Sequence, residues 1–423
     1  MVNEQVPVQD TVADTVRVEG ARILATLIRT VGDVQLAEDA VQEASLAALG
    51  AWPVTGVPPE PRAWLTVTAR RKAIDILRRE RARPDKERDG LRMIELGRSE
   101  LPPNDVVHDD LLRLIFTCCH PALSPPTRVA LALRTLCGLS PAQIAAVLLT
   151  TEAATTKRLT RARQKIVTAH IPYRVPAADE LADRLPTVCG MIHSLYTAGH
   201  APVDGRAAYD VDVCAEAVRL AKLLHALLPD QPMPAAVLAL LLLTDARRPA
   251  RLDERGAIVT LDEQDRGRWD AAAIARGIAL LNDSLRRSHG QADAYQLQAA
   301  IAAEHARSPS YDDTDWQKIL RIYDLLVSIA PSDAAGLGRV VAATEATGPV
   351  TGLAMVAELP PSPRWHAVRG ELLAREGRYA AAARELAESL DGPATHPEQQ
   401  HRERRREAFL QLAVRTPPDE REP

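Results

Sequence analysis

The chain has 423 residues, of which 46% are hydrophobic, and its formal net charge is −4 at pH 7. This length favours two or three domains, and the apolar content excludes an intrinsically disordered chain. The slightly acidic balance excludes a uniformly basic nucleic-acid-binding protein, so any such role must depend on local charge. Aromatic residues make up only 3%, while Ala, Leu and Arg are abundant, which predicts an all-α fold.

The five cysteines show no spacing typical of a disulfide framework. They are Cys118, Cys119, Cys137, Cys189 and Cys214. We expect buried thiols in a reducing cytoplasm, and the "CCHP" at 118–121 lacks the second ligand pair that structural zinc needs. No metal or cofactor is therefore predicted. No apolar segment follows a basic start, and the apolar stretch at 234–246 is too short to span a bilayer, so we expect a cytoplasmic protein without membrane contact.

Residues 10–83 are predicted to form a first helical domain. In "GARILATLIRTV" an apolar stripe at helical spacing comprises Ile23, Leu24, Leu27, Ile28 and Val31. A second helix follows, with an apolar stripe of Leu36, Ala40, Ala44 and Ala47. Its polar residues include Asp33, Glu38, Asp39 and Glu43, with no Lys or Arg between them.

A loop is predicted over residues 52–61, because four prolines and a glycine oppose regular helix there. A helix resumes near residue 62. Residues 62–88 hold ten Lys or Arg against four acids, which predicts a nucleic-acid footprint. The polar, proline-bearing residues 84–109 are interpreted as a linker.

Residues 110–172 are predicted to form a second compact helical domain, with two short helices between 139 and 166. Ser140 and Thr151 are candidate N-caps for these two helices, and Pro141 suits the first helical position. The second helix carries Lys157, Arg158, Arg161, Arg163 and Lys165 against one acid, Glu152. A tight helix pair with a basic second member is typical of a DNA-binding helix-turn-helix. A solvated charged face of a helical bundle is the alternative.

Residues 178–423 are interpreted as an irregular helical-repeat domain. The segment 364–390 has the small-residue spacing of a helix-turn-helix repeat, and 315–332 ends as such a repeat's second helix does, with a proline just beyond. A small hairpin is possible at 250–261, where a Glu-Arg-Gly turn separates short apolar runs.

Three segments together resemble bacterial sigma factors of the extracytoplasmic-function (ECF) type. They are "DVQLAEDAVQEA", "WLTVTARRKAIDILRR" and "LSPAQIAAVLLTTEAATTKRLTRARQKI". The segment beginning "DDLLRLIFTCCHPALSPP" and the long helical C-terminal part resemble the subgroup with a tetratricopeptide-like extension. The resemblance implies that residues 10–83 are similar to sigma region 2 and residues 110–172 to region 4, and that the linker threads RNA polymerase.

The resemblance also implies roles for individual residues. Contacts with the minus-35 element fall to Thr155, Thr156, Lys157, Arg158, Arg161 and Arg163. Contacts with the melted minus-10 element fall to Trp64, Arg70, Arg71, Lys72, Arg78 and Arg79. Binding to the β′ clamp helices of core RNA polymerase is assigned to Asp33, Glu38, Asp39, Gln42 and Glu43. A contact with the β flap of polymerase is also implied. The expected partners are thus core polymerase and promoter DNA.

The resulting prediction is an alternative sigma factor whose C-terminal domain, residues 178–423, controls the first 170 residues through an intramolecular contact. An ordinary helix-turn-helix regulator with a helical sensor domain is the main alternative, but it leaves the acidic helix unexplained. A helical scaffold is another alternative. An enzyme is not predicted, because the Arg- and Asp-rich residues 245–270 lack a nucleophile elbow, a phosphate loop or metal-spaced ligands.

Overall fold

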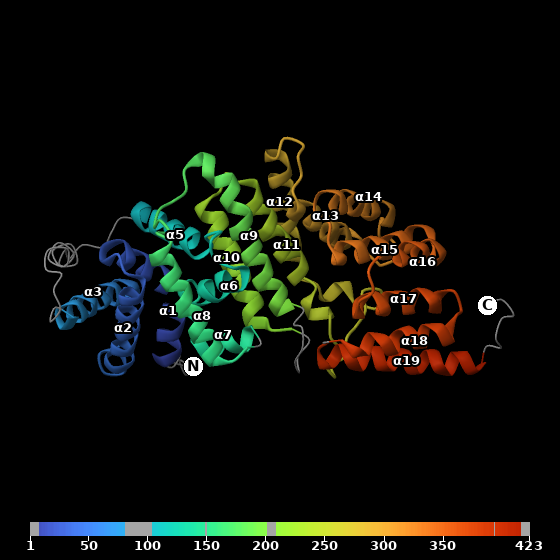
Figure 1. The fold of residues 1–423 in the computed structure, drawn as a ribbon, viewed down its shortest axis with the longest axis horizontal. Helices are drawn as coiled ribbons and strands as arrows, with labels where there is room; N and C mark the ends of the chain where they lie inside the picture. Colours follow the sequence, from blue (N-terminus) through green and yellow to red (C-terminus); the bar gives the residue numbers. More distant parts are fainter. Residues whose placement is uncertain (1–7, 81–103, 149, 201–208, 393, 416–423) are drawn as a thin grey trace, which may run out of the picture. The chain divides into compact units, whose positions relative to one another are not determined.

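The computed structural model describes residues 8–80, 104–148, 150–200, 209–392 and 394–415, and these residues are almost entirely helical (Figure 1). The predicted all-α class is therefore confirmed. The chain divides into two compact units, unit 1 (residues 1–194) and unit 2 (residues 195–423). The division falls within α9 (Ala178–His200), so the second unit begins later than the predicted boundary at residue 178.

Unit 1 begins with three helices, α1 (Val8–Val31), α2 (Val34–Thr55) and α3 (Pro61–Glu80). The side chain of Asp33 caps α2 by accepting a hydrogen bond from the backbone N–H of Leu36 at 3.0 Å. The apolar stripe predicted for α1 is buried at every position. On α2 the buried positions continue the four-residue spacing through Ala48, whereas the predicted Ala47 is only half-buried.

The loop predicted over residues 52–61 is wrong in its first four residues, because α2 continues to Thr55. Pro53 removes one helical hydrogen bond from this last turn. The turn persists because Trp52 is buried and its ring meets that of Trp64 on α3 edge to face, with ring centroids 5.5 Å apart. The helix ends at Gly56, whose φ of 80° favours glycine.

The next helices of unit 1 are α5 (Asn104–Cys118), α6 (Pro125–Thr135), α7 (Pro141–Val147) and α8 (Glu152–Thr168). The predicted linker falls outside the described residues up to residue 103, and its last part, 104–109, is helical instead. The reason is Asp110, which is fully buried and paired with Arg29 and Arg113, so the first turns of α5 are anchored although their composition is polar.

The predicted helix pair at 139–166 is confirmed as α7 and α8, and both predicted caps are present. Ser140 and Gln143 exchange hydrogen bonds between side chain and backbone, as in a capping box. The Thr151 hydroxyl accepts a hydrogen bond from the backbone N–H of Ala154 at 3.1 Å. The Ser140 cap fixes where α7 begins, and the Thr151 cap fixes where the basic helix α8 begins.

All five cysteines are buried as free thiols, which confirms the core-packing interpretation of "CCHP". The sulfur of Cys118 lies 3.0 Å from the Thr135 hydroxyl, and burial raises the pKa of this thiol to about 12. A thiol with such a pKa is unreactive near neutral pH.

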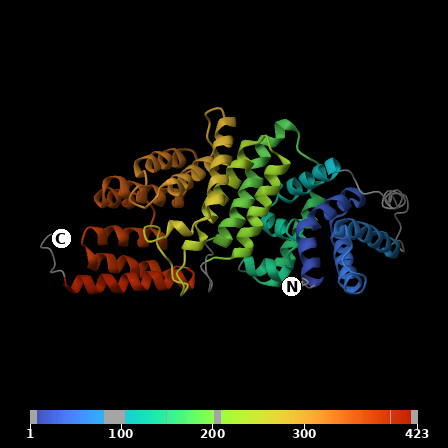
Figure 2. The ribbon, with the colours of Figure 1, turned by 180° about the vertical axis from the view of Figure 1, so that it is seen from behind.

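Unit 2 is an array of helices that stack on their neighbours in chain order. Its α-helices are α10 (Val211–Leu227), α11 (Pro232–Asp245), α12 (Ala271–Arg287), α13 (Ala294–Arg307), α14 (Trp316–Ile329), α15 (Asp333–Thr347), α16 (Pro349–Ala357), α17 (Pro363–Arg375), α18 (Tyr379–Glu388) and α19 (His396–Arg415). Short 3-10 turns occupy Arg248–Ala250, Arg266–Arg268 and Ser389–Asp391. Figures 1 and 2 both show α17, α18 and α19 side by side, which confirms the repeat predicted at 364–390.

Helix α11 contains the apolar stretch noted at 234–246 and is the buried centre of its neighbourhood, with residues 234–243 all enclosed. Among the described residues, no helix has the length and apolarity that crossing a membrane requires. The hairpin anticipated at 250–261 is reduced to an antiparallel bridge between Leu252 and Ile258 around a turn. The described residues contain no extended strand.

We expect Thr151→Ala to destabilise the start of α8 by about 1 kcal/mol, because the amide of Ala154 loses its capping acceptor. Amide hydrogen exchange measured along α8 should become faster in its first turn. Thr160→Ala is the matched control, since Thr160 is exposed on the same helix and bonds only to the carbonyl of Thr156. Equal exchange in Thr151→Ala and the parent would show that the cap does not hold the helix.

Candidate nucleic-acid and protein interface

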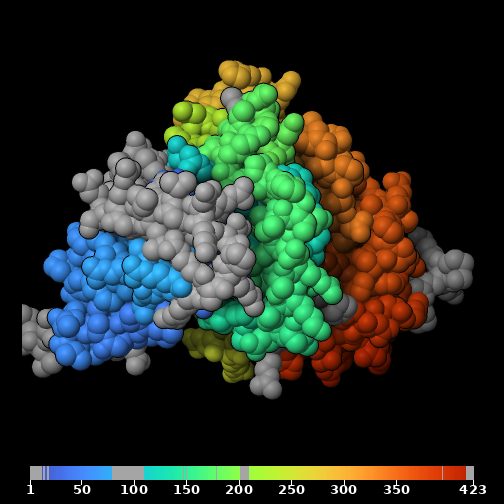
Figure 3. Space-filling model, turned by 60° about the vertical axis from the view of Figure 1, so that its left-hand side comes forward, coloured from blue at the N-terminus to red at the C-terminus, as the bar shows by residue number. Residues whose placement is uncertain are grey.

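The basic helix α8 presents part of its surface to solvent. Thr156, Lys157 and Arg161 are exposed, and Arg158 is half-buried. The opposite face packs on α6 and α7 through buried residues such as Leu159. Figure 3 shows the teal-to-green surface that includes α8. An exposed, cationic second helix of this kind can enter a major groove of DNA.

Two of the six residues predicted to contact the minus-35 element do not lie on this exposed surface. Thr155 is fully buried, and its hydroxyl has no hydrogen-bond partner among the described residues. Arg163 is turned toward α2 and is only 19% exposed. Thr155 and Leu159 share the inner face at helical spacing, so the phase of the helix excludes Thr155 from a DNA-facing surface in this arrangement.

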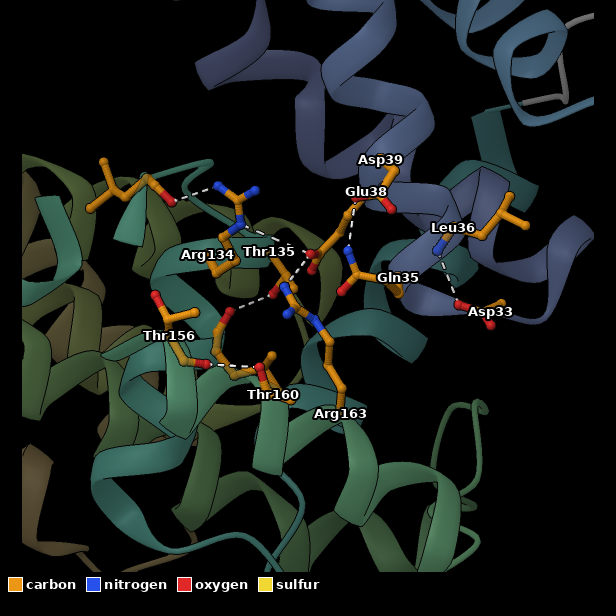
Figure 4. Close-up of polar contacts among 12 residues, drawn as sticks. Asp33, Gln35, Leu36, Glu38, Asp39, Arg134, Thr135, Thr156, Thr160 and Arg163 are labelled. Carbon is orange, nitrogen blue, oxygen red and sulfur yellow. Dashed lines mark hydrogen bonds and ion pairs between the residues drawn. The ribbon is translucent and has the colours of Figure 1, made fainter. Parts of the chain in front are cut away.

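Arg163 binds Glu38, one of the residues predicted to bind polymerase (Figure 4). Glu38 lies on the inner face of α2 and is 5% exposed. Arg163 donates a hydrogen bond from Nη2 to Oε2 of Glu38, and Nε of Arg134 on α6 lies 3.9 Å from the same oxygen. Arg134 also donates to the carbonyl of Leu139 at 3.0 Å. A residue predicted to bind polymerase, Glu38, and a residue predicted to bind DNA, Arg163, are therefore bound to each other.

This buried ion pair is incompletely satisfied. Burial raises the pKa of the Glu38 carboxyl above its ordinary value, although Arg163 and Arg134 both act to lower it. Glu38 Oε1 and Arg163 Nε are buried without a hydrogen-bond partner among the described residues. The pair therefore specifies how α2 and α8 meet, while the cost of burying its charges offsets much of its attraction.

A second polar contact joins α1 to α5 and was not found from the sequence. Arg29 Nε lies 3.0 Å from Oδ2 of Asp110, whose other oxygen accepts from Arg113 at 2.8 Å. The Tyr173 hydroxyl, which follows α8, donates to the carbonyl of Ala25 at 2.8 Å and lies 3.3 Å from that of Asp110. The sequence could have indicated only the Asp110–Arg113 pair, because residues three positions apart on a helix are neighbours.

A groove of about 580 Å³ on unit 1 adjoins the Glu38 contact. Its walls are mainly apolar and include Leu24, Val41 and Leu46, with Gln42 and Arg134 among the polar side chains. Leu46 is 68% exposed. The seam between α2 and the α6–α7 turn is thus only partly filled.

The remaining residues predicted to bind polymerase lie along α2. Asp33 serves as the N-cap described above, and Gln42 is exposed. Asp39 is exposed and accepts a hydrogen bond from Gln35 at 2.8 Å. Glu43 is half-buried, with its carboxylate 3.3 Å from the ammonium of Lys72 on α3. The exposed part of this set is therefore Asp33, Asp39 and Gln42.

On α3 the residues predicted to contact the minus-10 element divide by helical phase. Arg71 and Arg78 are exposed, and Arg78 lies 3.9 Å from Asp75. Arg70 is buried, and burial together with the nearby Arg29 lowers the pKa of its guanidinium. Trp64 is half-buried, and its ring packs against that of Trp52. Lys72 pairs with Glu43, and the Arg79 side chain lies outside the described part of the structure.

Comparison with known protein families gives three matches along the chain. Sigma-70 region 2 matches residues 16–83, sigma-70 region 4 matches residues 113–166, and a family of unknown function (DUF6596) matches residues 184–285. The matched sigma-70 families are not enzyme families. The part similar to region 2 contains most of α1 and all of α2 and α3. The part similar to region 4 contains the end of α5, all of α6 and α7, and most of α8.

Two relatives and one solved structure are similar to the chain. Uncharacterized protein R00370 of Rhizobium meliloti (strain 1021) is 40% identical over 369 residues, which cover 85% of this chain and 86% of that protein. A probable ECF RNA polymerase sigma factor, SigI of Mycobacterium tuberculosis, is 33% identical over 173 residues, which cover 40% of this chain and 59% of SigI. Yeast Tom70 aligns with 97% of this chain and 86% of its own, at 12% identity and a TM-score of 0.38.

The order of the two matched regions, the helix-turn-helix and the SigI likeness define a class of transcription protein. The chain belongs to the ECF type of the sigma-70 family, and it is a sigma factor with a long helical C-terminal part. We call residues 8–80 the region 2 part and residues 104–174 the region 4 part.

We expect Arg163→Met to destabilise the packing of α2 on α8 by about 3–5 kcal/mol, because it leaves the Glu38 carboxylate buried without its main partner. Glu38→Gln in the same chain should restore most of this loss. The measurement is amide hydrogen exchange of α2 and α8, which reports the free energy of local opening. Arg161→Met is the control because Arg161 is exposed on the same helix. Additive effects of Arg163→Met and Glu38→Gln would contradict a coupled pair.

Proposed function

We propose that the chain binds core RNA polymerase and directs promoter-specific transcription initiation under the control of its own C-terminal domain. One observation carries most of the proposal: unit 1 exposes a cationic helix-turn-helix surface on α8 and an acidic surface on α2. A simple DNA-binding regulator needs only the first surface. The likeness to SigI, a probable ECF RNA polymerase sigma factor, supports the same function.

In the proposed complex the region 4 part reads the minus-35 element through α8. Lys157 and Arg161 are exposed and can reach phosphates or base edges, and Arg158 borders them. Phosphate contacts position the helix, whereas base contacts supply sequence preference. Arg163 would join this set only after leaving Glu38, and Thr155 supports the helix from inside.

The region 2 part would hold the melted minus-10 element on α3. Arg71 and Arg78 offer exposed cations to the single strand, and the Trp52–Trp64 pair fixes the end of the preceding loop. Stacking and cationic contacts of this kind bind single-stranded DNA. Arg70 is buried, so we assign it a supporting role in the packing of α3 on α1.

The acidic surface of α2 would dock on the β′ clamp helices of polymerase, with the region 4 part near the β flap. Asp39 and Gln42 are already exposed, and Glu43 is within reach once Lys72 moves. Complementary charge accelerates association and disfavours wrong partners. An acidic surface repels DNA, so a protein partner suits it better.

Unit 2 would control unit 1 through an intramolecular contact. Helical repeats present extended surfaces that bind peptides, and unit 2 has a groove of about 240 Å³ between α15 and α17. Its walls include Val341, Val368 and Leu372, with Glu345 and Arg375 paired at its edge. A tethered segment of unit 1 would meet such a groove at high effective concentration.

We expect Arg161→Ala to weaken binding of the polymerase complex to its promoter by about 1–3 kcal/mol if Arg161 reaches a base edge. A loss that appears mainly as a shallower salt dependence would place Arg161 on a phosphate instead. Lys165→Ala is the control, because Lys165 is an exposed cation one turn further from the N-terminal, base-reading part of α8. The measurement is a salt series of promoter affinity. Unchanged affinity and salt slope in Arg161→Ala would remove α8 from the promoter contact.

Reversing charge in Asp39→Lys/Glu43→Lys should weaken binding to core polymerase at least tenfold, because two attractive contacts become repulsive. The measurement is core affinity by fluorescence anisotropy at fixed salt, with circular dichroism to show that the helices persist. Glu254→Lys is the matched control, since Glu254 is an exposed acid of unit 2. Parental affinity in the double variant would show that α2 does not dock on polymerase.

Control by unit 2 is tested with a chain that ends after His200, the last residue of α9. This end point keeps the buried residues of α9 that fall within unit 1, such as Val188 and Ile192. We expect altered transcription from the cognate promoter, provided that unit 1 retains its helical content. Identical core affinity, promoter choice and output in both chains would exclude a regulatory role for residues 201–423.

A further inference from the structure

In unit 2 the Arg- and Asp-rich residues 245–270 use their acids and several of their arginines in different places. Asp253, Asp265 and Asp270 each accept hydrogen bonds from backbone N–H groups two to four residues further along the chain. These carboxylates therefore stabilise turns and the start of α12. Within the described residues, no carboxylate forms an ion pair with three arginines of the same segment, namely Arg247, Arg251 and Arg266.

Two of these arginines lie over the ring of the buried Trp269. The guanidinium carbon of Arg266 is 4.9 Å from the ring centroid, and that of Arg247 is 5.4 Å from it. Arg266 is also held by the backbone, since it donates hydrogen bonds to the carbonyls of His305 and Ser308, each at 2.6 Å. Arg247 is not held in this way, because its Nε is buried without a hydrogen-bond partner among the described residues.

Two further buried nitrogens beside these arginines lack a hydrogen-bond partner in the described part of the chain. They are Nε1 of Trp269 and Nδ1 of His305. Both side chains are enclosed, at 6% and 9% exposure. The indole N–H is always a donor, and a histidine Nδ1 donates when it carries the proton. Buried donors are paired in the great majority of cases, so three unpaired ones on neighbouring side chains indicate a site for an acceptor.

The electrostatics of this region favour an acceptor with negative charge. Burial, together with Arg247 and Arg266, lowers the pKa of His305 to about 4. Burial, Arg251 and Arg266 lower the pKa of Arg247 to about 10, which still leaves its guanidinium charged at neutral pH. A buried cation that has other cations for neighbours is stabilised by an anion that bonds to it.

We propose that Arg247, Trp269 and His305 form a binding site in unit 2 for the oxyanion of a small molecule, either a carboxylate or a phosphate group. A guanidinium matches the oxygens of both groups, and the two ring nitrogens add directed donors. Because Trp269 and His305 are enclosed, the site suits a small group and not the surface of a macromolecule.

The position of the site gives a bound anion a structural effect. Arg247 follows the end of α11, Trp269 precedes α12, and His305 lies in the last turn of α13. These three helices pack together through one apolar cluster that includes Leu243 and Leu281. An anion that bonds to all three side chains therefore ties the ends of the three helices together, which goes beyond the proposed function by giving unit 2 a chemical input.

The first test follows the indole N–H signals of the full-length chain labelled with ¹⁵N-tryptophan. The chain has five tryptophans, and Trp269→Phe identifies the signal of interest. The probes are sodium phosphate and sodium acetate, with sodium chloride at matched ionic strength as the control. We expect a saturable downfield shift of the Trp269 signal with phosphate or acetate, because its N–H gains an oxygen acceptor, and no such shift with chloride.

The second test asks whether Arg247 binds an anion or only packs on Trp269. Arg247→Met keeps an apolar stem on the ring and removes the charge, so in chloride the variant should be at least as stable as the parent. At an anion concentration one hundred times the dissociation constant, the ratio of folded to unfolded parent should rise about a hundredfold beyond any change in the variant. Thermal unfolding of both chains measures this difference, and non-specific stabilisation by salt is common to the two. Arg268→Met is the matched control, since Arg268 is exposed in the same segment and its variant should keep the parental response.

The outcomes are distinct for each reading of the site. A response to phosphate alone identifies a phosphate ligand and a response to acetate alone a carboxylate, and either result supports the site. No saturable shift of the Trp269 signal beyond that in chloride would overturn it. Equal stabilisation of Arg247→Met and the parent by the anion would overturn it as well, and if this variant does not fold, the titration of the parent decides. None of these measurements involves polymerase, so a failure of sigma-factor function and a failure of the anion site are separately visible.

Discussion

The arrangement of unit 1 depends on one buried carboxylate. Glu38 is enclosed at the meeting point of α2, α6 and α8, where Arg163 and Arg134 approach it. Removing a charge from water is costly, and burial indeed raises the pKa of this carboxyl despite two nearby guanidinium groups. The region 4 part must therefore supply these cations for its packing against α2. Without them, α2 would have to present Glu38 to solvent or to another cationic partner.

Helical phase decides which polar residues remain available around this contact. On α8 the inner face holds Thr155 and Leu159, so the neighbouring Thr156 and Lys157 point outward. On α3 the same geometry buries Arg70 and exposes Arg71. Two adjacent residues of similar chemistry therefore have different roles, one in packing and one on a surface that can bind a partner. The charged side chains of such a surface supply its affinity for a partner, and the helix caps fix where the helix that carries them begins.

The fold could be predicted from the sequence where a pattern is local. Ser140 specifies the start of α7 and Thr151 the start of α8, and the apolar spacing of α1 determines its buried face. The contact between Glu38 and Arg163 could not be predicted, because it joins residues 125 positions apart and no local pattern records it. The continuation of α2 through Pro53 could not be predicted either, because this continuation depends on the tertiary contact between Trp52 and Trp64.

The sequence therefore predicted which helices carry the charged residues, but not which of those residues are exposed. Charge density correctly marked α8 as the basic member of a helix-turn-helix, but it could not separate Arg161, which is exposed, from Arg163, which is held by an acid. Likewise, the acidic face of α2 was visible in the sequence, while the burial of Glu38 within it depends on a partner from a distant segment. Composition reports which charges a helix carries, and only the packed structure shows which of them are free to bind.

The most direct test of sigma-factor function is run-off transcription with purified core polymerase and this chain on a set of genomic DNA fragments, combined with footprinting of the active fragments. We expect discrete start sites that require both proteins, with protection upstream of each start at two elements that match the reach of a separated region 2 part and region 4 part. Protection by the chain alone at a single compact site, with no start site that depends on the chain, would identify a helix-turn-helix regulator and contradict the assignment.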